Sequence, residues 1–554
     1  MRIVLYGWVE GALDSLMMIL FQWLRINRNS GLDEMNLLFR HSKPFAHKIV
    51  TLKGMLFLLV LAAFLPSSAI AVGCPTGCIC NDETYIVQCE HSKLDVIPIT
   101  LNPAIQRLVL RNNKIRTVDA AFQFYRDLQY VDLSSNHLIN IPTKSFQHQD
   151  KLQELHLNKN NLSSVNNKTF QGLKALTVLN LRENLLLELS QGTFSILPKL
   201  EELNLGHNQI SKIDSLAFHG LPNLRVLYLD DNQLTSVPTP AFPSITNLAE
   251  LHVGLNGFQY LQDDSFKGLN RLSVLDLSSG GISNISEHGF RGLTTLRNLN
   301  LADNRLQQIP TSQLGYLTRL EELTIGQNEY VNLPKGSFKG LTNLRKLDIT
   351  GAKNLEHIEK GVFSDNMNLE TIKLVSNRKL ENLEEGALVG LPNLRHLVLR
   401  ENAFKSLPES VVSWNELRAL ELTDNPIICD CQLLWLLNLA NQKNLTNVQC
   451  ASPLHLRDRP LKSLTSDDLG CSFNDPSQQV IIVTFCVSAT ILLAVLGLFL
   501  FRYRIKVRDA LKDYKFNKRA ISRKEHEYQK TFSEDEYTLR TGQLPIKHIP
   551  VTEL

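Results

Sequence analysis

The sequence has 554 residues, of which 43% are hydrophobic and 20% are charged, the composition of a folded rather than a disordered protein. A formal net charge of only +3 excludes a protein that binds nucleic acid through its overall charge. The length would indicate several domains unless an internal repeat extends one core along the chain.

The N-terminal segment has the layout of a signal peptide. An apolar run at residues 56–65 follows Lys48 and Lys53, and a run of small residues ends at Ala71. This layout predicts cleavage after Ala71, so that Val72 begins the secreted part. An uncleaved anchor is the alternative, although the apolar run is short for a membrane span. Because the leader is long, the starting methionine would be Met1, Met35 or Met55.

Eight of the nine cysteines fall into two groups of four, at the two ends of a long cysteine-free region. The groups are Cys74, Cys78, Cys80 and Cys89, and then Cys429, Cys431, Cys450 and Cys471. Such groups after a signal peptide predict two disulfide-bonded caps, each of which allows three pairings. A four-cysteine zinc site is the competing interpretation, which the absence of paired C-x-x-C knuckles disfavours.

Between the cysteine groups, the pattern L-x-x-L-x-L-x-x-N-x-L recurs about every 24 residues, which is the leucine-rich-repeat signature. Leu152, Leu155, Leu157 and Asn160 are one example. Phenylalanines keep the same spacing as an independent marker. The asparagine position falls at residues 113, 136, 160, 184, 208, 232, 256, 280, 304, 328, 352, 377, 402 and 425, which gives 14 repeats.

The repeat predicts the fold class, an α/β-type solenoid with a curved parallel sheet. In L-x-L both leucines point to one face of a short strand, and the residues between them point to the other. One coil cannot bury its leucines, but stacked coils share a continuous apolar core, with the sheet on the concave side. The buried asparagine should bond to the backbone of its own and the adjacent coil. Gly280 and Ala352 replace it, and we expect a local irregularity near residues 350–380.

Residues 480–501 form an uncharged run of 22 residues, long enough for one transmembrane helix. Four basic residues follow within the next seven positions, which predicts that the C-terminal side is cytoplasmic and the N-terminal part extracellular. Residues 502–554 contain 13 Lys and Arg against 8 Asp and Glu, and are expected to form a disordered tail. Cys486 lies inside the run and is expected to be apolar filler.

No catalytic or metal-binding pattern accompanies the repeats. H-E-x-x-H, G-x-S-x-G, P-loop and kinase motifs are absent from the sequence. Acidic pairs such as Glu201 and Glu202 occupy variable strand positions, where charges are usually solvated. We therefore expect no enzymatic activity and no metal or cofactor, and we expect other cell-surface proteins rather than nucleic acid as partners.

Four N-glycosylation sequons indicate which surface stays free for binding. They lie at Asn161, Asn167, Asn284 and Asn444, outside the L-x-x-L-x-L strands. Glycans would then occupy the turns, the outer face and the C-terminal cap, and would leave the concave sheet bare. Exposed aromatic and charged residues are favoured at interfaces, with an ordinary solvated residue as the alternative for each. The candidate contact residues are Tyr130, Asp132, Arg225, Tyr228 and Asp230.

The chain ends in Thr552-Glu553-Leu554. An apolar last residue with a free carboxylate, and a hydroxyl two residues earlier, are the features that a PDZ groove recognises when a peptide extends its sheet. These three residues therefore predict a cytoplasmic PDZ scaffold as a partner.

Two resemblances to known proteins extend the predictions for the caps and the tail. The cysteine groups, the second with Pro426 and Trp435, resemble the caps of extracellular leucine-rich-repeat proteins. The tail segments at 519–524 and 537–540 and the ending PVTEL resemble the insect Capricious/Tartan-type transmembrane adhesion proteins, and the short tail is closer to Capricious. The cap resemblance implies the pairs Cys74–Cys80, Cys78–Cys89, Cys429–Cys450 and Cys431–Cys471.

The adhesion-protein resemblance implies a cell-surface recognition receptor that acts in neuronal target selection, synaptic partner choice or cell-affinity boundaries. Its binding would be homophilic or heterophilic. A ligand-binding signalling receptor whose short tail recruits cytoplasmic effectors is the alternative. The expected domains are a leader (1–71), an N-terminal cap (72–101), about 14 repeats (102–425), a C-terminal cap (426–473), a short stalk (474–479), a transmembrane helix (480–501) and a cytoplasmic tail (502–554).

Overall fold

The computed structural model describes residues 73–118, 120–443, 445, 447–471, 476–504, 506 and 508–519. The predicted leader, the sequon asparagine at 444 and the C-terminal Thr552-Glu553-Leu554 lie outside these residues. The chain divides into two compact units, Met1–Leu464 and Thr465–Leu554.

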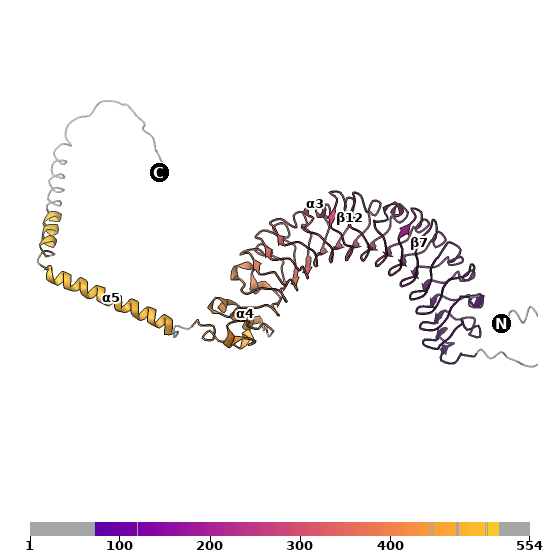
Figure 1. Cartoon of the computed structure of the whole chain (residues 1–554), viewed down its shortest axis with the longest axis horizontal. Helices are drawn as coiled ribbons and strands as arrows, with labels where there is room; N and C mark the ends of the chain where they lie inside the picture. Colours follow the sequence, from indigo (N-terminus) through magenta and orange to yellow (C-terminus); the bar gives the residue numbers. More distant parts are fainter. Residues whose placement is uncertain are drawn as a thin grey trace, which may run out of the picture. The chain divides into compact units, whose positions relative to one another are not determined.

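The first unit is a curved solenoid whose concave side is lined by one 16-stranded sheet (Figure 1). β1 (Ile79–Asn81) and β2 (Ile86–Gln88) are antiparallel, and all later neighbours are parallel with one strand per repeat. The expected fold class is therefore confirmed. The later strands are β3 (Arg107–Val109), β4 (Tyr130–Asp132), β5 (Glu154–His156), β6 (Val178–Asn180), β8 (Glu202–Asn204), β10 (Val226–Tyr228), β11 (Glu250–His252), β13 (Val274–Asp276), β15 (Asn298–Asn300), β16 (Glu322–Thr324), β18 (Lys346–Thr350), β20 (Thr371–Val375), β22 (His396–Val398) and β23 (Ala419–Glu421).

The core runs the length of the solenoid, because equivalent residues of successive coils stack on one another. Leu203, Leu227 and Leu251 are in register across β8, β10 and β11, and all three are fully buried. On the outer side of the core, the repeated phenylalanines are also buried, and Phe338 and Phe363 stack with ring centroids 5.7 Å apart. The continuous apolar core predicted from the repeat spacing is thus present.

The buried asparagines join each coil to the one before it. Asn208 Nδ2 donates to Leu205 O in its own coil and to Leu181 O in the preceding coil, both at 3.0 Å. Its Oδ1 accepts a hydrogen bond from the preceding coil's Leu186 N at 3.1 Å. We call this repeated set of bonds the asparagine ladder. The same three bonds are made by Asn136, Asn160, Asn184, Asn232, Asn256, Asn304 and Asn328.

One gap in the ladder is filled by a tyrosine. In the regular pattern, a residue at 352 would donate to Ile325 O, but Ala352 has no amide. The hydroxyl of Tyr330 donates to Ile325 O instead, at 2.9 Å. Tyr330 is fully buried, and burial raises the pKa of its hydroxyl, so the group stays protonated as a donor. The irregularity expected near residues 350–380 is present as well, because β18 and β20 have five residues where other strands of the repeats have three.

The outer side of the solenoid is built from turns, short strands and a few helical turns. A repeat of about 24 residues leaves little chain for a regular helix once the strand and both turns are formed. Three small parallel sheets lie here: β7 (Glu188–Leu189) with β9 (Lys212–Ile213), β12 (Tyr260–Leu261) with β14 (Asn284–Ile285), and β17 (Asn332–Leu333), β19 (His357–Ile358) and β21 (Asn382–Leu383). The helical turns are η1 (Ala120–Phe124), η2 (Thr239–Ser244), α3 (Thr311–Leu314), η3 (Glu409–Val411) and η4 (Trp414–Glu416).

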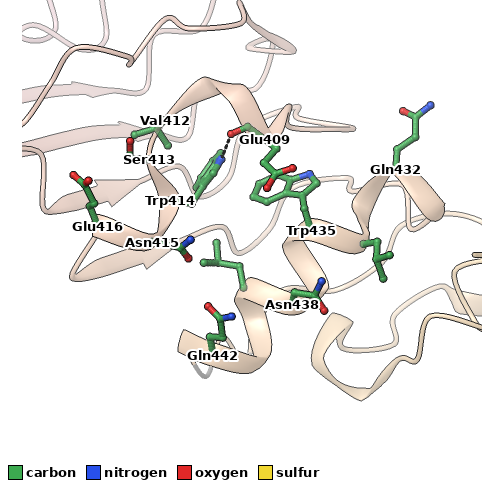
Figure 2. A pocket seen from close by; sticks show the side chains of 12 residues that line it. Glu409, Val412, Ser413, Trp414, Asn415, Glu416, Gln432, Trp435, Asn438 and Gln442 are labelled. Carbon is green, nitrogen blue, oxygen red and sulfur yellow. Dashed lines mark hydrogen bonds between the residues drawn. The ribbon is translucent and has the colours of Figure 1, made fainter.

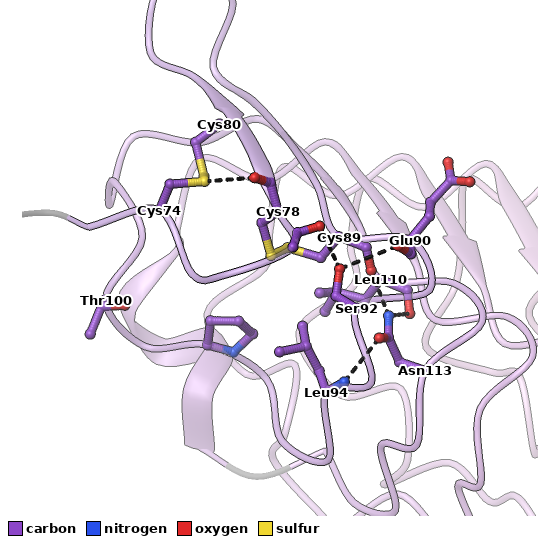
Figure 3. Close-up of a disulfide and its surroundings, with 12 residues drawn as sticks. Cys74, Cys78, Cys80, Cys89, Glu90, Ser92, Leu94, Thr100, Leu110 and Asn113 are labelled. Carbon is purple, nitrogen blue, oxygen red and sulfur yellow. Dashed lines mark hydrogen bonds between the residues drawn. A yellow bond between two sulfur atoms is a disulfide. The ribbon is translucent and has the colours of Figure 1, made fainter.

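The N-terminal cap continues the stacking scheme of the repeats (Figure 3). It contains the disulfides Cys74–Cys80 and Cys78–Cys89. Cys89 is fully buried, and its carbonyl accepts a hydrogen bond from Asn113 Nδ2 at 2.6 Å, as a leucine carbonyl does in a regular coil. The cap is therefore held by the first asparagine of the ladder as well as by its disulfides.

The C-terminal cap packs helical segments against the last repeat. It contains the disulfide Cys429–Cys450, and Cys431 and Cys471 are also disulfide-bonded. The pairing of Cys431 with Cys471 remains a proposal. The segments are η5 (Cys431–Leu433), α4 (Leu434–Lys443), η6 (Leu454–Leu456) and η7 (Leu461–Ser463).

The second unit contains α5 (Pro476–Arg502), whose part Val480–Arg502 is the one helix among the described residues that is long and apolar enough to cross a membrane. The structure differs from the sequence prediction just beyond it, because residues 508–519 are helical where a disordered tail was expected. Alternating basic, acidic and apolar residues with no proline or glycine permit this helix.

The asparagine ladder makes a direct stability prediction. We expect Asn208→Ala to lower the free energy of unfolding by about 1–3 kcal/mol, because it leaves the buried Leu186 N and Leu181 O without these partners. Urea unfolding of the segment that carries the caps and repeats measures this. Asn140→Ala, at an exposed position, is the matched control and should change little. Equal effects of the two substitutions would contradict the role of the ladder.

Candidate recognition surface

The five contact residues predicted from the sequence lie on the concave side in two separate places. Tyr130 and Asp132 belong to β4, whereas Tyr228 ends β10, with Arg225 just before this strand and Asp230 just after it. Asp132 is buried, contrary to the expectation of an exposed position, because its Oδ1 accepts a hydrogen bond from Ser134 N at 2.9 Å. It therefore shapes the turn after β4 rather than presenting a charge.

Tyr130 is half-buried and is covered by a neighbouring cation. The guanidinium carbon of Arg107 lies 3.4 Å from the centre of the Tyr130 ring, a close cation–π contact between adjacent strands. Burial, and then the charge of Asp132, raises the pKa of Tyr130. A partner reaching Tyr130 would have to contact or displace Arg107.

Tyr228 and Asp230 line a polar hollow of about 410 Å³ on the concave side. Arg225 is exposed but is not among the lining residues. Five successive coils contribute to the wall, so the hollow exists only because the coils stack. The other residues that line it are Arg182, Asn204, His252, Gly254, Leu255, Asp276 and Ser278.

An ion pair crosses the floor of the hollow. Arg182 Nη1 lies 2.8 Å from Asp230 Oδ2, although the two residues are two repeats apart. The coil between them carries Gly206 at the equivalent position. A Cβ on Gly206 would lie 2.4 Å from Arg182 Nη1 and 2.6 Å from Asp230 Oδ1. The missing side chain at 206 is therefore what allows the arginine to reach the aspartate.

Tyr228, His252 and Asp276 form a row of side chains along the hollow, one from each of three neighbouring coils. Tyr228 stacks on His252 with ring centroids 4.6 Å apart and an interplanar angle of 16°. His252 Nδ1 lies 3.8 Å from Asp276 Oδ2. Burial raises the pKa of Asp276, but the nearby His252 imidazole and the hydrogen bond from Ser278 N outweigh this and lower it overall. Burial, followed by nearby acidic side chains, raises the pKa of Tyr228.

Two buried polar atoms in the hollow have no hydrogen-bond partner in the described part of the chain, Asp230 Oδ1 and His252 Nε2. The nearest carboxylate oxygen to His252 Nε2 belongs to Glu250 at 3.9 Å, beyond hydrogen-bond length. Leaving a buried polar group unpaired costs free energy. Because both atoms are inaccessible to solvent, an incoming polar side chain would reach them only after the side chains that cover them had moved.

Sequence reasoning missed Arg182, His252 and Asp276, although the repeat contains a signal for them. Tyr228, His252 and Asp276 occupy the same position of three consecutive repeats, and Arg182 and Asp230 share another position two repeats apart. Reading the sequence at intervals of one repeat places these side chains next to one another. Among the described residues, no three His, Cys, Asp or Glu side chains are grouped to hold a metal ion.

The described sequon asparagines lie away from the concave sheet. Asn161 and Asn167 are exposed in the turns after β5, and Asn284 is exposed in β14 of a small outer sheet. Glycans at these three positions would leave the hollow uncovered.

A second, larger hollow of about 850 Å³ lies at the C-terminal cap (Figure 2). Trp414 and Trp435 meet there with ring centroids 5.0 Å apart, and Trp414 Nε1 donates to Glu409 O at 3.0 Å. Trp414 is buried, whereas Trp435 is half-buried on α4. The ring contact joins the last repeat to α4 of the cap.

Comparison with known proteins agrees with this architecture. The leucine rich repeat model matches residues 126–186, 174–234, 246–306, 294–355, 318–378, 342–404 and 367–427, and the leucine rich repeat C-terminal domain model matches 447–472. The solved structure of the Toll–Spatzle complex of Drosophila has a TM-score of 0.51 at 19% identity and covers 67% of this chain and 62% of that one. At this identity the likeness concerns the fold alone.

Curated relatives include two glycoproteins. Mouse trophoblast glycoprotein is 32% identical over 142 residues, which is 22% of this chain and 33% of the relative. Human platelet glycoprotein IX is 37% identical over 91 residues, which is 15% of this chain and 51% of the relative. The chain thus spans a third to a half of these relatives. The repeat matches cover more than half of the 554 residues, and the chain therefore belongs to the leucine-rich repeat family.

Proposed function

We propose that this chain is a cell-surface recognition and adhesion receptor that binds partner proteins through the concave face of its repeats. The observation that carries the proposal is the polar hollow around Tyr228, which is lined by side chains of five successive coils on the concave side. Because the surrounding coils are stacked on a rigid core, this surface would lose little conformational entropy when a partner binds. The absence of sequons from the sheet agrees with a contact role.

The resemblance of the tail to the Capricious/Tartan-type proteins supports a setting in neuronal target selection, synaptic partner choice or cell-affinity boundaries. Under this proposal the chain is not an enzyme, and its partners are other cell-surface proteins, including copies of itself. A signalling receptor with the same concave site is the alternative. Aggregation of cells that express the chain favours adhesion, whereas ligand-induced tail phosphorylation without aggregation favours signalling.

The proposed topology is a single-pass type I protein of the plasma membrane, with the repeats outside. The basic residues that follow the apolar helix support this orientation. An epitope tag inserted after Val72 should be reached by antibody on intact cells, and a tag after Lys506 should be reached only after permeabilisation. The reverse pattern would contradict the topology.

A glycan placed in the hollow tests the contact surface. Tyr228→Asn with Asp230→Thr creates a sequon on the strand, and we expect it to abolish binding of cells to partner cells, because a glycan there excludes a protein sterically. Cell aggregation with surface expression measured in parallel provides the readout. Both the variant and its controls should reach the cell surface.

Two controls separate the glycan from other effects. Tyr228→Asn with Asp230→Ala removes the same side chains without a sequon and should weaken recognition less. Pro334→Thr creates a sequon at Asn332, which is exposed in β17 of an outer sheet, and should leave recognition intact. Loss of recognition with the Asn332 glycan, together with survival under the strand glycan, would place the contact on the outer side.

The proposed cytoplasmic partner is a PDZ scaffold that binds Thr552-Glu553-Leu554. Removing Leu554, or changing Thr552 to Ala, should abolish recovery of PDZ-domain proteins because the groove binds both the terminal carboxylate and the hydroxyl. Pull-down with the tail variants checks this, with surface expression as the control. Unchanged recovery of PDZ-domain proteins would refute the proposed scaffold.

A further inference from the structure

A helical segment follows the apolar helix and concentrates positive charge on one face. Residues 508–519 are helical, and each of them is exposed. Arg508, Lys512, Lys515 and Arg519 are spaced by four, three and four residues, so all four lie on one stripe of a helix with 3.6 residues per turn. We call these four residues the basic stripe.

The other faces of the same helix differ in chemistry. Asp509 and Asp513 are four residues apart and form an acidic row, and Asp509 lies three residues before Lys512 of the basic stripe. Leu511 and Tyr514 lie together on one side of the stripe, in a row with Lys518, and are 60% and 67% exposed. The helix thus places apolar side chains beside cations, an arrangement suited to the boundary between lipid headgroups and acyl chains.

The charges of the basic stripe are not neutralised within the described part of the chain, where no ion pair involves any of its four residues. The cations closer to the apolar helix differ, because Arg504 and Lys506 lie over the rings of Phe501 and Tyr503. The preference for Lys and Arg on the cytoplasmic side of a membrane span does not depend on where along the segment these residues lie. It therefore does not explain why the four cations of the basic stripe align on one face of a helix.

The length of the helix also calls for a partner surface. An isolated helix of about twelve residues is marginal in water, since nucleation is costly and few bonds repay it. The surface nearest in sequence is the membrane that the apolar helix is proposed to cross, because only five residues lie between Arg502, the end of that helix, and Arg508. Its cytoplasmic leaflet carries anionic headgroups, which match the sign of the stripe.

We propose that residues 508–519 form an amphipathic helix that binds anionic lipid headgroups of the same membrane through the basic stripe, with Leu511 and Tyr514 inserted at the interface. This rests on the proposed topology, which puts the segment at the cytoplasmic leaflet. Binding would hold the start of the tail against the bilayer. Neutralising modification of the stripe or competing cations would then release it.

The experiment uses the full chain in lipid nanodiscs and follows hydrogen exchange of the amides of 508–519. The discs contain phosphatidylcholine alone, phosphatidylcholine with phosphatidylserine, or phosphatidylcholine with a phosphoinositide. We expect exchange to slow by roughly tenfold or more in either anionic disc relative to the neutral disc. The two anionic arms distinguish general attraction from preference for a phosphorylated headgroup. Both leaflets have the same composition, so the result does not depend on orientation in cells.

Two four-substitution variants test the stripe itself. Arg508→Gln, Lys512→Gln, Lys515→Gln and Arg519→Gln should remove the slowing in anionic discs. Asp509→Lys, Lys512→Asp, Asp513→Lys and Lys515→Asp keeps composition and net charge but disperses the stripe, and should lose most of the slowing. Equal exchange in neutral and anionic discs for the unmodified chain would overturn the proposal. Full slowing in the dispersed variant would overturn the role of the stripe.

Discussion

A single coil of this chain covers neither its leucines nor the carbonyls at its turn, and both are covered only when the next coil stacks on it. The asparagine ladder carries the polar half of this requirement. Asn208, for example, bonds to two groups of the preceding coil and one of its own. The continuous core and the caps follow from the need for a neighbouring coil, since a coil without one has unpaired groups on its open side.

The same stacking creates the concave surface that we propose for recognition. Neighbouring strands are held in register, so side chains at one repeat position form rows across the sheet. Gly206 has no side chain, which leaves a gap in one of these rows. Arg182 reaches across this gap to Asp230. The hollow is therefore a product of sequence variation on a fixed frame, and substitutions at these positions alter its shape without altering the fold.

Periodicity made the fold predictable, because leucine, asparagine and phenylalanine repeat in positions that only one arrangement buries together. The role of Tyr330 was not predictable, since it depends on an asparagine missing one repeat later and on a hydroxyl that reaches Ile325 O. Asp132 was predicted to be exposed, but it is buried and accepts a hydrogen bond from Ser134 N in the turn.

The site was predicted only in part. Tyr228 and Asp230 were found as aromatic and charged residues in a strand, but their neighbours come from coils 24 or 48 residues away. Contacts at that separation become visible only when the sequence is aligned by repeat. The basic stripe was hidden for a different reason: a tail rich in charge suggests disorder, whereas the alignment of its cations appears only once the segment is helical.

We propose that recognition takes place on the concave sheet around the hollow. The most direct measurement is a hydrogen-exchange footprint of the chain bound to a partner, obtained by screening residues 72–479 against cell-surface ectodomains that include the chain itself. Protection should concentrate in β8, β10, β11 and β13 and the turns that follow them. Protection confined to the outer sheets β7–β9 and β12–β14, with the concave strands unchanged, would show that the partner binds the outer side instead.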